Sequence, residues 1–193
     1  MSKKTNNTKS KIVNAAWKLF YDQGYDETTV DEIIAESGTS KGSFYHYFSS
    51  KDSLLGTLSY MFDEKYRELE PELDENSTCF EKLLFLNQQL FEMIENTIDI
   101  NLLAGLLSTQ LVTKGERNLL DNNRYYYKLI RKIIESGKIR GEIKADISTR
   151  EIVKLYAMCE RALMYDWCIS DGKYSIKTYA QNILPMLFDD IMM

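Results

Sequence analysis

The segment at residues 29–48 constrains the fold of this chain more than any other part of the sequence. Thr29, followed three residues later by Glu32, is the pattern of a capping box, in which each side chain bonds the other residue's backbone N–H at a helix start. Gly38 can adopt the left-handed backbone of a tight turn after that helix. Ser40 is a suitable N-cap for a second helix. Two short helices joined by such a turn predict a helix-turn-helix unit.

The second helix of this unit has residues that suit contact with a DNA groove. Successive side chains lie about 100° apart around a helix, so Phe44 and Phe48 share one face and are expected to pack inside. Gly42, Ser43 and His46 lie on the opposite face, where a glycine lets another surface approach the backbone closely. An ordinary helical hairpin with half-buried aromatic residues is the alternative interpretation.

Two lysines flank this helix at places that favour phosphate groups. Lys41 lies in its first turn, where free backbone N–H groups and the helix dipole attract anions. Lys51 lies near the start of the following helix and offers a second positive charge. This spacing suits a helix that lies in a DNA groove and contacts the phosphate backbone at each end.

The residues from Gly38 to Lys51, GTSKGSFYHYFSSK, resemble the recognition motif of the TetR/AcrR family of bacterial repressors. The upstream residues 15–25 resemble the first helix of that family and its end. The resemblance in motif covers the N-terminal part of the chain, and the remainder agrees in length and helical character. The sequence departs from the commonest family residues at Thr39, Ser43 and Phe44.

The resemblance implies that eight residues contact DNA. Phosphate contacts fix affinity and register, whereas base contacts select the sequence. The residues expected to affect affinity broadly are Thr29, Tyr47 and Lys51. The residues expected to affect sequence choice are Lys41, Ser43 and His46. Gly42 and Tyr45 complete the implied set.

The distribution of charge agrees with a DNA-binding end on an acidic body. The chain carries 24 Lys and Arg against 29 Asp and Glu, a net charge of −5. Its first 55 residues contain seven of each sign, so the acidic excess falls on the remainder. The Lys-rich segment at residues 3–18 precedes any acidic residue, and we expect it to form a flexible arm that lies on phosphate.

Several other classes of protein are disfavoured. No apolar run is long enough to span a membrane, and no targeting segment is visible. The three cysteines lack the spacing of a zinc site, and the chain has one histidine. We therefore expect a cytoplasmic protein without a metal, a cofactor or membrane contact.

An enzyme is the rival class, because residues 38–42 match the G-x-S-x-G pattern of hydrolases. That pattern requires a strand before the serine and a histidine partner. Here a helix is predicted before Ser40, and His46 lies on the outer face of the next helix. We therefore predict no enzymatic activity, with an esterase disfavoured. A helical adaptor or sensor without DNA binding remains the alternative.

The rest of the sequence predicts helices throughout. Long helices are expected from Ser50 to Leu69 and from Glu116 to Ser136, and no segment shows the alternation of a strand. We predict an all-α fold of about nine helices with short connections. Residues 6–66 would form a three-helix DNA-binding domain with the helix-turn-helix, and residues 67–193 a helical ligand-binding and dimerisation domain.

Two further capping boxes divide the C-terminal part into helices. Thr78 with Glu81 and Ser148 with Glu151 each place a hydroxyl residue three positions before a glutamate. The helix after Ser148 and the last helix are apolar on several sides, which predicts burial on several sides. The family uses these helices for a homodimer interface. The residues expected there are Ile152, Leu155, Tyr156, Cys159, Leu163, Tyr179, Ile183, Met186 and Leu187.

The resemblance also implies a pocket for a small-molecule effector between these helices and the DNA-binding motif. Aromatic and methionine side chains there would suit a mostly apolar or aromatic ligand, although a plain core is the alternative for any one of them. The expected lining residues are Tyr60, Phe85, Phe91, Met93, Gln110, Tyr126, Tyr156, Glu160, Met164 and Trp167. Effector binding would tilt the helix that begins near Lys51 and release a repressor dimer from a palindromic operator in double-stranded DNA.

Overall fold

The computed structural model describes residues 2–112 and 117–193, with the backbone alone for residues 2–7. The described residues form ten α-helices and two short 3₁₀ helices. The extended pairing among them is one isolated bridge between Ile143 and Met192. The predicted all-α fold is therefore confirmed. No helix in the described ranges is long and apolar enough to cross a membrane.

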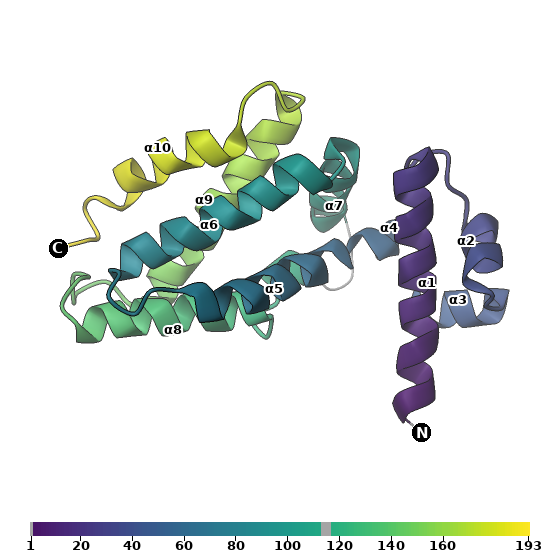
Figure 1. Cartoon of the computed structure of the whole chain (residues 1–193), viewed down its shortest axis with the longest axis horizontal. Helices are drawn as coiled ribbons and strands as arrows, with labels where there is room; N and C mark the ends of the chain where they lie inside the picture. Colours follow the sequence, from purple (N-terminus) through teal and green to yellow (C-terminus); the bar gives the residue numbers. More distant parts are fainter. Residues whose placement is uncertain (1, 113–116) are drawn as a thin grey trace.

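Three N-terminal helices form the part of the chain that contains the predicted DNA-binding motif. These are α1 (Ser2–Gln23), α2 (Val30–Ser37) and α3 (Lys41–Tyr47). In Figure 1, α2 and α3 lie on one side of α1, at the opposite end of the molecule from the C-terminus. Because α1 begins at Ser2, the Lys-rich segment that we expected to be a flexible arm is helical.

Local capping interactions fix the helix-turn-helix as the sequence predicted. The Thr29 hydroxyl accepts a hydrogen bond from the Glu32 N–H at 3.3 Å, and the Glu32 carboxylate accepts one from the Thr29 N–H at 2.7 Å. Gly38 has a φ of 61°, the left-handed backbone that ends α2. The Ser40 hydroxyl accepts a hydrogen bond from the Ser43 N–H at 3.1 Å and caps α3.

A small apolar core holds the three helices together. Phe44 is fully buried and Phe48 is nearly so, in agreement with their predicted inward face. They belong to the same buried cluster as Ile12, Phe20 and Ile33 of the neighbouring helices. Packing of this kind stabilises short helices that would be marginal alone, so α3 is presented as a rigid element.

The helix predicted from Ser50 to Leu69 is divided into two. Helix α4 spans Lys51–Leu55 and α5 spans Leu58–Leu69. Thr57 lies between them, donating a hydrogen bond from its hydroxyl to the Leu54 carbonyl at 2.6 Å and accepting one from the buried Trp17 indole N–H at 2.8 Å. A distant tryptophan therefore helps to fix the break, which local sequence could not reveal.

The remaining elements form a helical bundle. One helix of this bundle was predicted to run from Glu116 to Ser136. Glu116 lies outside the described residues, and the helix found in this region begins at Tyr125. The predicted caps at Thr78 and Ser148 are confirmed. The elements are η1 (Glu70–Glu72), α6 (Cys79–Thr97), α7 (Ile100–Val112), η2 (Asn118–Leu120), α8 (Tyr125–Ile139), α9 (Thr149–Ile169) and α10 (Ile176–Phe188).

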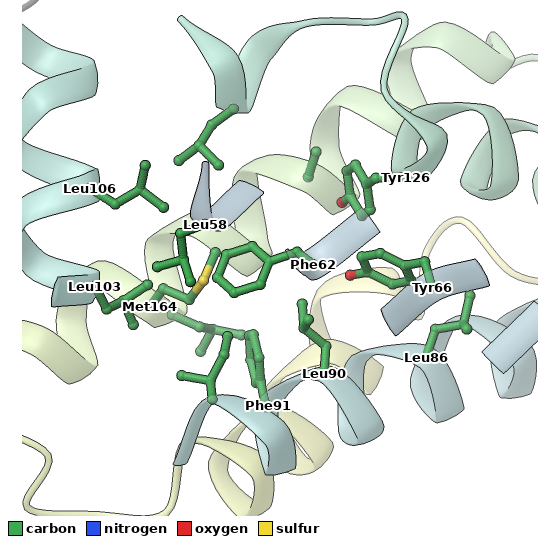
Figure 2. Packing of buried hydrophobic residues seen from close by; sticks show 14 of the residues in the cluster. Leu58, Phe62, Tyr66, Leu86, Leu90, Phe91, Leu103, Leu106, Tyr126 and Met164 are labelled. Atoms are coloured by element: carbon green, nitrogen blue, oxygen red, sulfur yellow. The ribbon is translucent and has the colours of Figure 1, made fainter. Parts of the chain in front are cut away.

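The bundle encloses a large apolar core between α5, α6, α7, α8 and α9. Figure 2 shows Phe62 at its centre, with Leu90 and Phe91 of α6 and Met164 of α9 around it. Helix α10 packs mainly on α6, and α8 packs on α9 and α6. The predicted domain boundary at residues 66–67 falls inside α5 and stays a prediction.

A buried ion pair joins α5 to the start of α8. The Arg124 guanidinium donates to the Asp63 carboxylate at 2.9 and 3.2 Å and to the Ser59 carbonyl at 2.8 Å. The same carboxylate accepts the Tyr126 backbone N–H at 3.2 Å. Both charged side chains are less than a tenth exposed. Removing one partner of such a pair leaves a buried charge uncompensated, which costs about 3–5 kcal/mol.

Candidate nucleic-acid interface and effector site

Helix α3 presents most of the predicted DNA-contacting residues to solvent. Lys41, Gly42, Tyr45 and His46 are exposed. Ser43 is half-buried, and its hydroxyl lies 2.9 Å from that of Ser40. Tyr47 is half-buried, with its ring edge-on to the His46 ring at 4.7 Å between centroids. The structure therefore brings this set together on one face, and their contacts with DNA stay a prediction.

Gly42 has no structural need to be glycine within the chain. Its backbone is helical, and a Cβ atom built there would meet only the Ser40 hydroxyl, at 3.9 Å. A methyl group would therefore fit inside this molecule and would favour the helix. The absence of a side chain matters only for a surface that approaches from outside, which is the property expected of a groove-binding helix.

Weak or local partners hold the polar groups at the edge of this face. The Lys41 ammonium lies 3.3 Å from the Asp31 carboxylate, and both side chains are more than 60% exposed. Exposed pairs of this kind contribute about 0–1 kcal/mol, so the lysine can exchange its partner for a phosphate at little cost. The Thr29 hydroxyl donates to the Glu32 carboxylate at 2.8 Å as part of the α2 cap.

Lys51 has a structural role that the sequence did not reveal. Its ammonium donates to the backbone carbonyls of Tyr25 and Asp26 at 2.6 and 3.3 Å and lies 4.2 Å from the centre of the Tyr25 ring. The Tyr25 hydroxyl in turn donates to the Asp52 carboxylate. Lys51 therefore fastens the loop between α1 and α2 to the start of α4. Its predicted phosphate contact would add to this role.

A surface of exposed apolar side chains covers adjacent parts of α9 and α10. Tyr165 and Met158 are about half exposed on α9, and Met186 is 75% exposed on α10. Large exposed apolar patches usually mark an interaction site. We call this surface the apolar face. Its residues are Leu155, Met158, Ala162, Tyr165, Ile169, Tyr179, Ile183, Met186 and Leu187.

The apolar face differs from the predicted dimer interface. Ile152, Tyr156 and Leu163 are buried within the chain itself, and Cys159 is half-buried against the core. Because these three side chains are buried within one chain, a part for them in a dimer interface stays a prediction. An apolar pattern around a whole helix does not tell which side faces the chain's own core.

A small cavity lies inside the bundle, bordered by polar as well as apolar groups. We call it the inner cavity, and its volume is about 30 Å³. A space of that size holds one or two water-sized groups. It is lined by Phe62, Tyr66, Leu90, Leu119, Arg124, Tyr126, Ala157, Glu160, Arg161 and Met164.

Glu160 is the most unusual of these residues because its carboxyl group is buried and forms no ion pair with the described residues. It accepts hydrogen bonds from the Asn87 amide at 2.9 Å and from the Tyr126 hydroxyl at 2.5 Å. Burial raises the pKa of the Glu160 carboxyl, and these hydrogen bonds offset part of that rise. The interior of this bundle therefore contains a polar cluster that apolar packing alone does not require.

A larger groove opens outside the inner cavity, between α7, η2 and α9. We call it the outer groove, and its volume is about 480 Å³, within the usual range of small-molecule sites. Arg117 and Arg161 border it, and neither forms an ion pair within the described parts of the chain. Leu119 and Arg161 line both spaces, so the outer groove and the inner cavity adjoin at these two residues.

The remaining walls of the outer groove are mostly apolar. Such a site, with apolar walls and two arginines that form no ion pair with the described residues, is suited to an amphipathic anion. The described residues that line it are Leu107, Gln110, Leu111, Arg117, Leu119, Leu120, Arg161, Ala162 and Tyr165.

The structure gathers some of the predicted pocket residues and separates others. Tyr126, Glu160 and Met164 line the inner cavity, and Gln110 lines the outer groove. Tyr156 is buried and donates its hydroxyl to the Leu83 carbonyl at 2.8 Å. Phe91 lies in the apolar core, and Phe85 and Met93 are half-buried on α6. None of these last four lines either space.

Two predicted pocket residues lie elsewhere. Tyr60 is 54% exposed, with the Lys9 ammonium 5.8 Å from its ring centre. Trp167 donates its indole N–H to the Tyr174 carbonyl at 2.8 Å, away from both spaces. Sequence reasoning missed Tyr66, Arg117 and Leu119, whose roles depend on contacts between helices that are distant in the chain.

Element η2 lies between the outer groove and the junction of α4 and α5. The Gln110 side-chain oxygen accepts a hydrogen bond from the Leu119 N–H at 3.2 Å. The Gln110 backbone carbonyl accepts one from the Arg117 guanidinium at 2.8 Å. The neighbouring Asn118 amide lies so close to Gly56 that a Cβ there would be 2.1 Å away. Element η2 therefore contacts both the outer groove and the junction of α4 and α5.

Comparison with known proteins identifies relatives along the whole chain. Residues 12–58 match the family model for bacterial regulatory proteins of the tetR family, and residues 60–190 match the model for the C-terminal region of YsiA-like protein. The fatty acid metabolism regulator protein of Bacillus subtilis (strain 168) is 23% identical over 184 residues, which cover 93% of each chain.

Two solved structures share the fold. FadR from Thermus thermophilus in complex with lauroyl-CoA has a TM-score of 0.75 and 22% identity, covering 93% of this chain and 92% of that one. FadR from Bacillus subtilis in complex with stearoyl-CoA has a TM-score of 0.68 and 23% identity, covering 92% and 96%. At these identities the likeness shows the common fold.

Gly42→Ala should separate stability from DNA binding. Alanine favours a helix over glycine by up to about 1 kcal/mol, and the added methyl group meets open space within the chain. We expect a melting temperature equal to or above that of the unchanged protein, with at least tenfold weaker binding to its preferred DNA duplex. Thermal denaturation and fluorescence anisotropy measure the two effects. Unchanged DNA affinity would remove Gly42 from the interface.

Glu160→Gln should change the pH dependence of stability. The folded state raises the pKa of Glu160 above its ordinary value of 4.5. Between the unfolded and the folded pKa, the folded state therefore binds more protons than the unfolded state, and stability falls as pH rises through this range. The variant should therefore melt at a higher temperature than the unchanged protein at pH 7, and the difference should vanish near pH 4.

Glu151→Gln is the control of opposite sign. Hydrogen bonds from Ser148 lower the pKa of the Glu151 carboxyl, so its stabilising contribution is present above the unfolded pKa and is lost as pH falls. This variant should melt at a lower temperature than the unchanged protein at pH 7. Parallel pH profiles for the Glu160 and Glu151 variants would contradict the assignment of the buried carboxyl.

Proposed function

We propose that this chain, which belongs to the tetR family of bacterial regulatory proteins, represses transcription as a homodimer that an acyl-CoA effector releases from DNA. Its family membership makes it a ligand-responsive, DNA-binding transcriptional regulator. The outer groove carries this proposal, because its apolar walls suit an acyl chain and its two arginines, which form no ion pair with the described residues, suit the phosphates of coenzyme A. The complexes of related FadR proteins with lauroyl-CoA and stearoyl-CoA support the same class of effector.

The proposed homodimer forms through the apolar face of α9 and α10. Met186 and Tyr165 would be covered by the same face of a second chain, as in an isologous two-fold interface. A two-fold dimer presents two copies of α3 to DNA, which fits a palindromic operator whose half-sites are about one helical turn apart. The exposed face of α3, with Lys41, then supplies the base contacts, and Thr29 and Lys51 lie beside the phosphate backbone.

The proposed switch uses the contact between η2 and the α4–α5 junction. An effector in the outer groove displaces the wall that contains Leu119, and Asn118 of the same element lies against Gly56. Helix α4 also contacts α7, where the Leu55 side chain lies 3.0 Å from a Cβ built on Gly105. Since a ligand shifts a population only by its differential affinity, the effector must bind better to the DNA-incompetent arrangement.

Selection from a random pool of DNA duplexes tests the operator and the dimer together. We expect enrichment of a palindrome with half-sites about one turn apart. Met186→Glu places a charge on the apolar face, at a side chain that is already 75% exposed, and should give a monomer with at least tenfold weaker binding to that palindrome. Light scattering and anisotropy provide the measurements.

The matched control for this experiment is Ile139→Glu. Ile139 is 87% exposed at the end of α8, away from the apolar face, so the dimer and its DNA affinity should persist. A dimeric Met186→Glu protein would move the interface to another surface. No enriched sequence and no salt-sensitive duplex binding would favour a helical adaptor that has lost DNA binding.

Release of the protein from its selected duplex tests the effector class. Lauroyl-CoA and stearoyl-CoA should each release it, whereas coenzyme A alone and dodecanoic acid alone should require at least tenfold higher concentrations. Arg161→Gln removes a charge at the groove and should raise the required acyl-CoA concentration about tenfold or more. Arg67→Gln, at an exposed pair on α5, is the matched control. Equal potency of dodecanoic acid and lauroyl-CoA would contradict the role of the arginines.

A further inference from the structure

The Tyr66 hydroxyl is buried without a hydrogen-bond partner among the residues that the structure describes. The side chain is 1% exposed, so surface water does not reach it. Most buried polar side-chain atoms in proteins have a partner, and an unpaired one is unfavourable. Burial raises the pKa of the Tyr66 phenol, and the nearby Glu160 carboxyl raises it further through its charge and its close approach, although the geometry between the two groups is not that of a hydrogen bond. This phenol is therefore a hydrogen-bond donor available to another molecule.

The available donor faces the inner cavity together with an acceptor. Figure 2 shows the hydroxyl groups of Tyr66 and Tyr126 both directed towards Phe62, and the two rings lie 5.1 Å apart between centroids. The Tyr126 hydroxyl is already bonded to Glu160. Each carboxylate oxygen can accept more than one hydrogen bond, so Glu160 retains accepting capacity. The cavity thus offers one donor and one acceptor to a single small polar group.

The volume of the inner cavity sets the size of that group. About 30 Å³ accommodates a water-sized group, such as a hydroxyl, and excludes a ring or a long hydrocarbon chain. The outer groove, at about 480 Å³, holds the bulk of a ligand and shares Leu119 and Arg161 with the inner cavity. A ligand lying in the groove can therefore project one polar substituent inwards.

We propose that the effector carries a hydroxyl group on its apolar chain, and that this group enters the inner cavity, accepts a hydrogen bond from Tyr66 and donates one to Glu160. The inference rests on the proposed function, because it assigns a chemical class to the effector of the same site. An unsubstituted chain would leave Tyr66 unpaired and place methylene groups against a carboxyl group. A buried polar site of this kind discriminates strongly against an analogue that lacks the matching group.

Binding of matched ligand pairs tests the proposal. The probes are lauroyl-CoA with its 3-hydroxy and 12-hydroxy derivatives, and dodecanoic acid with the same two derivatives. Isothermal titration of the full-length protein should give at least tenfold tighter binding for one hydroxylated probe than for the unsubstituted probe of the same series. In Tyr66→Phe this ratio should fall at least about fivefold, because only the hydrogen bond to Glu160 remains, while the affinity for the unsubstituted probe stays within about twofold of the unchanged protein.

Tyr156→Phe is the matched control. Tyr156 is also fully buried, but its hydroxyl already donates to the Leu83 carbonyl, and it does not line the inner cavity. Its removal should leave the ratio between hydroxylated and unsubstituted probes unchanged. Because Tyr66→Phe deletes only an unpaired atom, that variant should melt at no lower a temperature than the unchanged protein.

The outcomes separate this inference from the proposed acyl-CoA effector. Equal affinities within both series, or a preference of unchanged size in Tyr66→Phe, would overturn the inference even where acyl-CoA releases the protein from DNA. A Tyr66-dependent preference among the free acids, with no binding of the thioesters, would overturn the acyl-CoA proposal and support the hydroxyl site. Absence of binding by all six probes would overturn both.

Discussion

The junction between α4 and α5 is the contact on which the regulatory use of this fold depends. The Thr57 hydroxyl accepts a hydrogen bond from the buried Trp17 indole N–H, which links α1 to the junction. Gly56 has no side chain, so η2 can lie against its backbone. Helix α4 has five residues, and a helix of that length is not stable alone. Its position is therefore set by its neighbours on both sides. The proposed switch uses these contacts to couple the orientation of the DNA-reading helices to the wall of the outer groove.

The polar interior of the bundle is explained better by recognition than by stability. A buried ion pair is often no more stabilising than apolar residues of similar volume, yet Asp63 and Arg124 hold the first turn of α8 at a fixed place beside α5. Glu160 and Tyr66 add polar groups that an apolar core would omit. These groups border one small space, which makes them suited to select among ligands of similar length.

The sequence predicted the features that local interactions decide. Capping at Thr29 and Ser40 and the turn at Gly38 follow from residues a few positions apart. The break in the predicted long helix depends on Trp17, 40 residues before Thr57, and no local pattern reveals such a contact. The predicted dimer interface has a similar limit. The periodicity of α9 identifies its apolar sides but not which of them the chain's own helices cover. The DNA-contacting residues stay predictions, on an exposed face that agrees with them.

The separation of Tyr66 from Gly42 has a consequence for how such a protein can be altered. Tyr66 belongs to α5, packed between α6 and α8, whereas Gly42 belongs to α3, which packs on α1 and α2 (Figure 1). Substitutions at distant sites without shared partners have nearly additive effects. Selectivity for the inducing compound and selectivity for the DNA sequence are thus independent variables. A biosensor built on this chain can be retuned to a new analyte while its reporter promoter is kept.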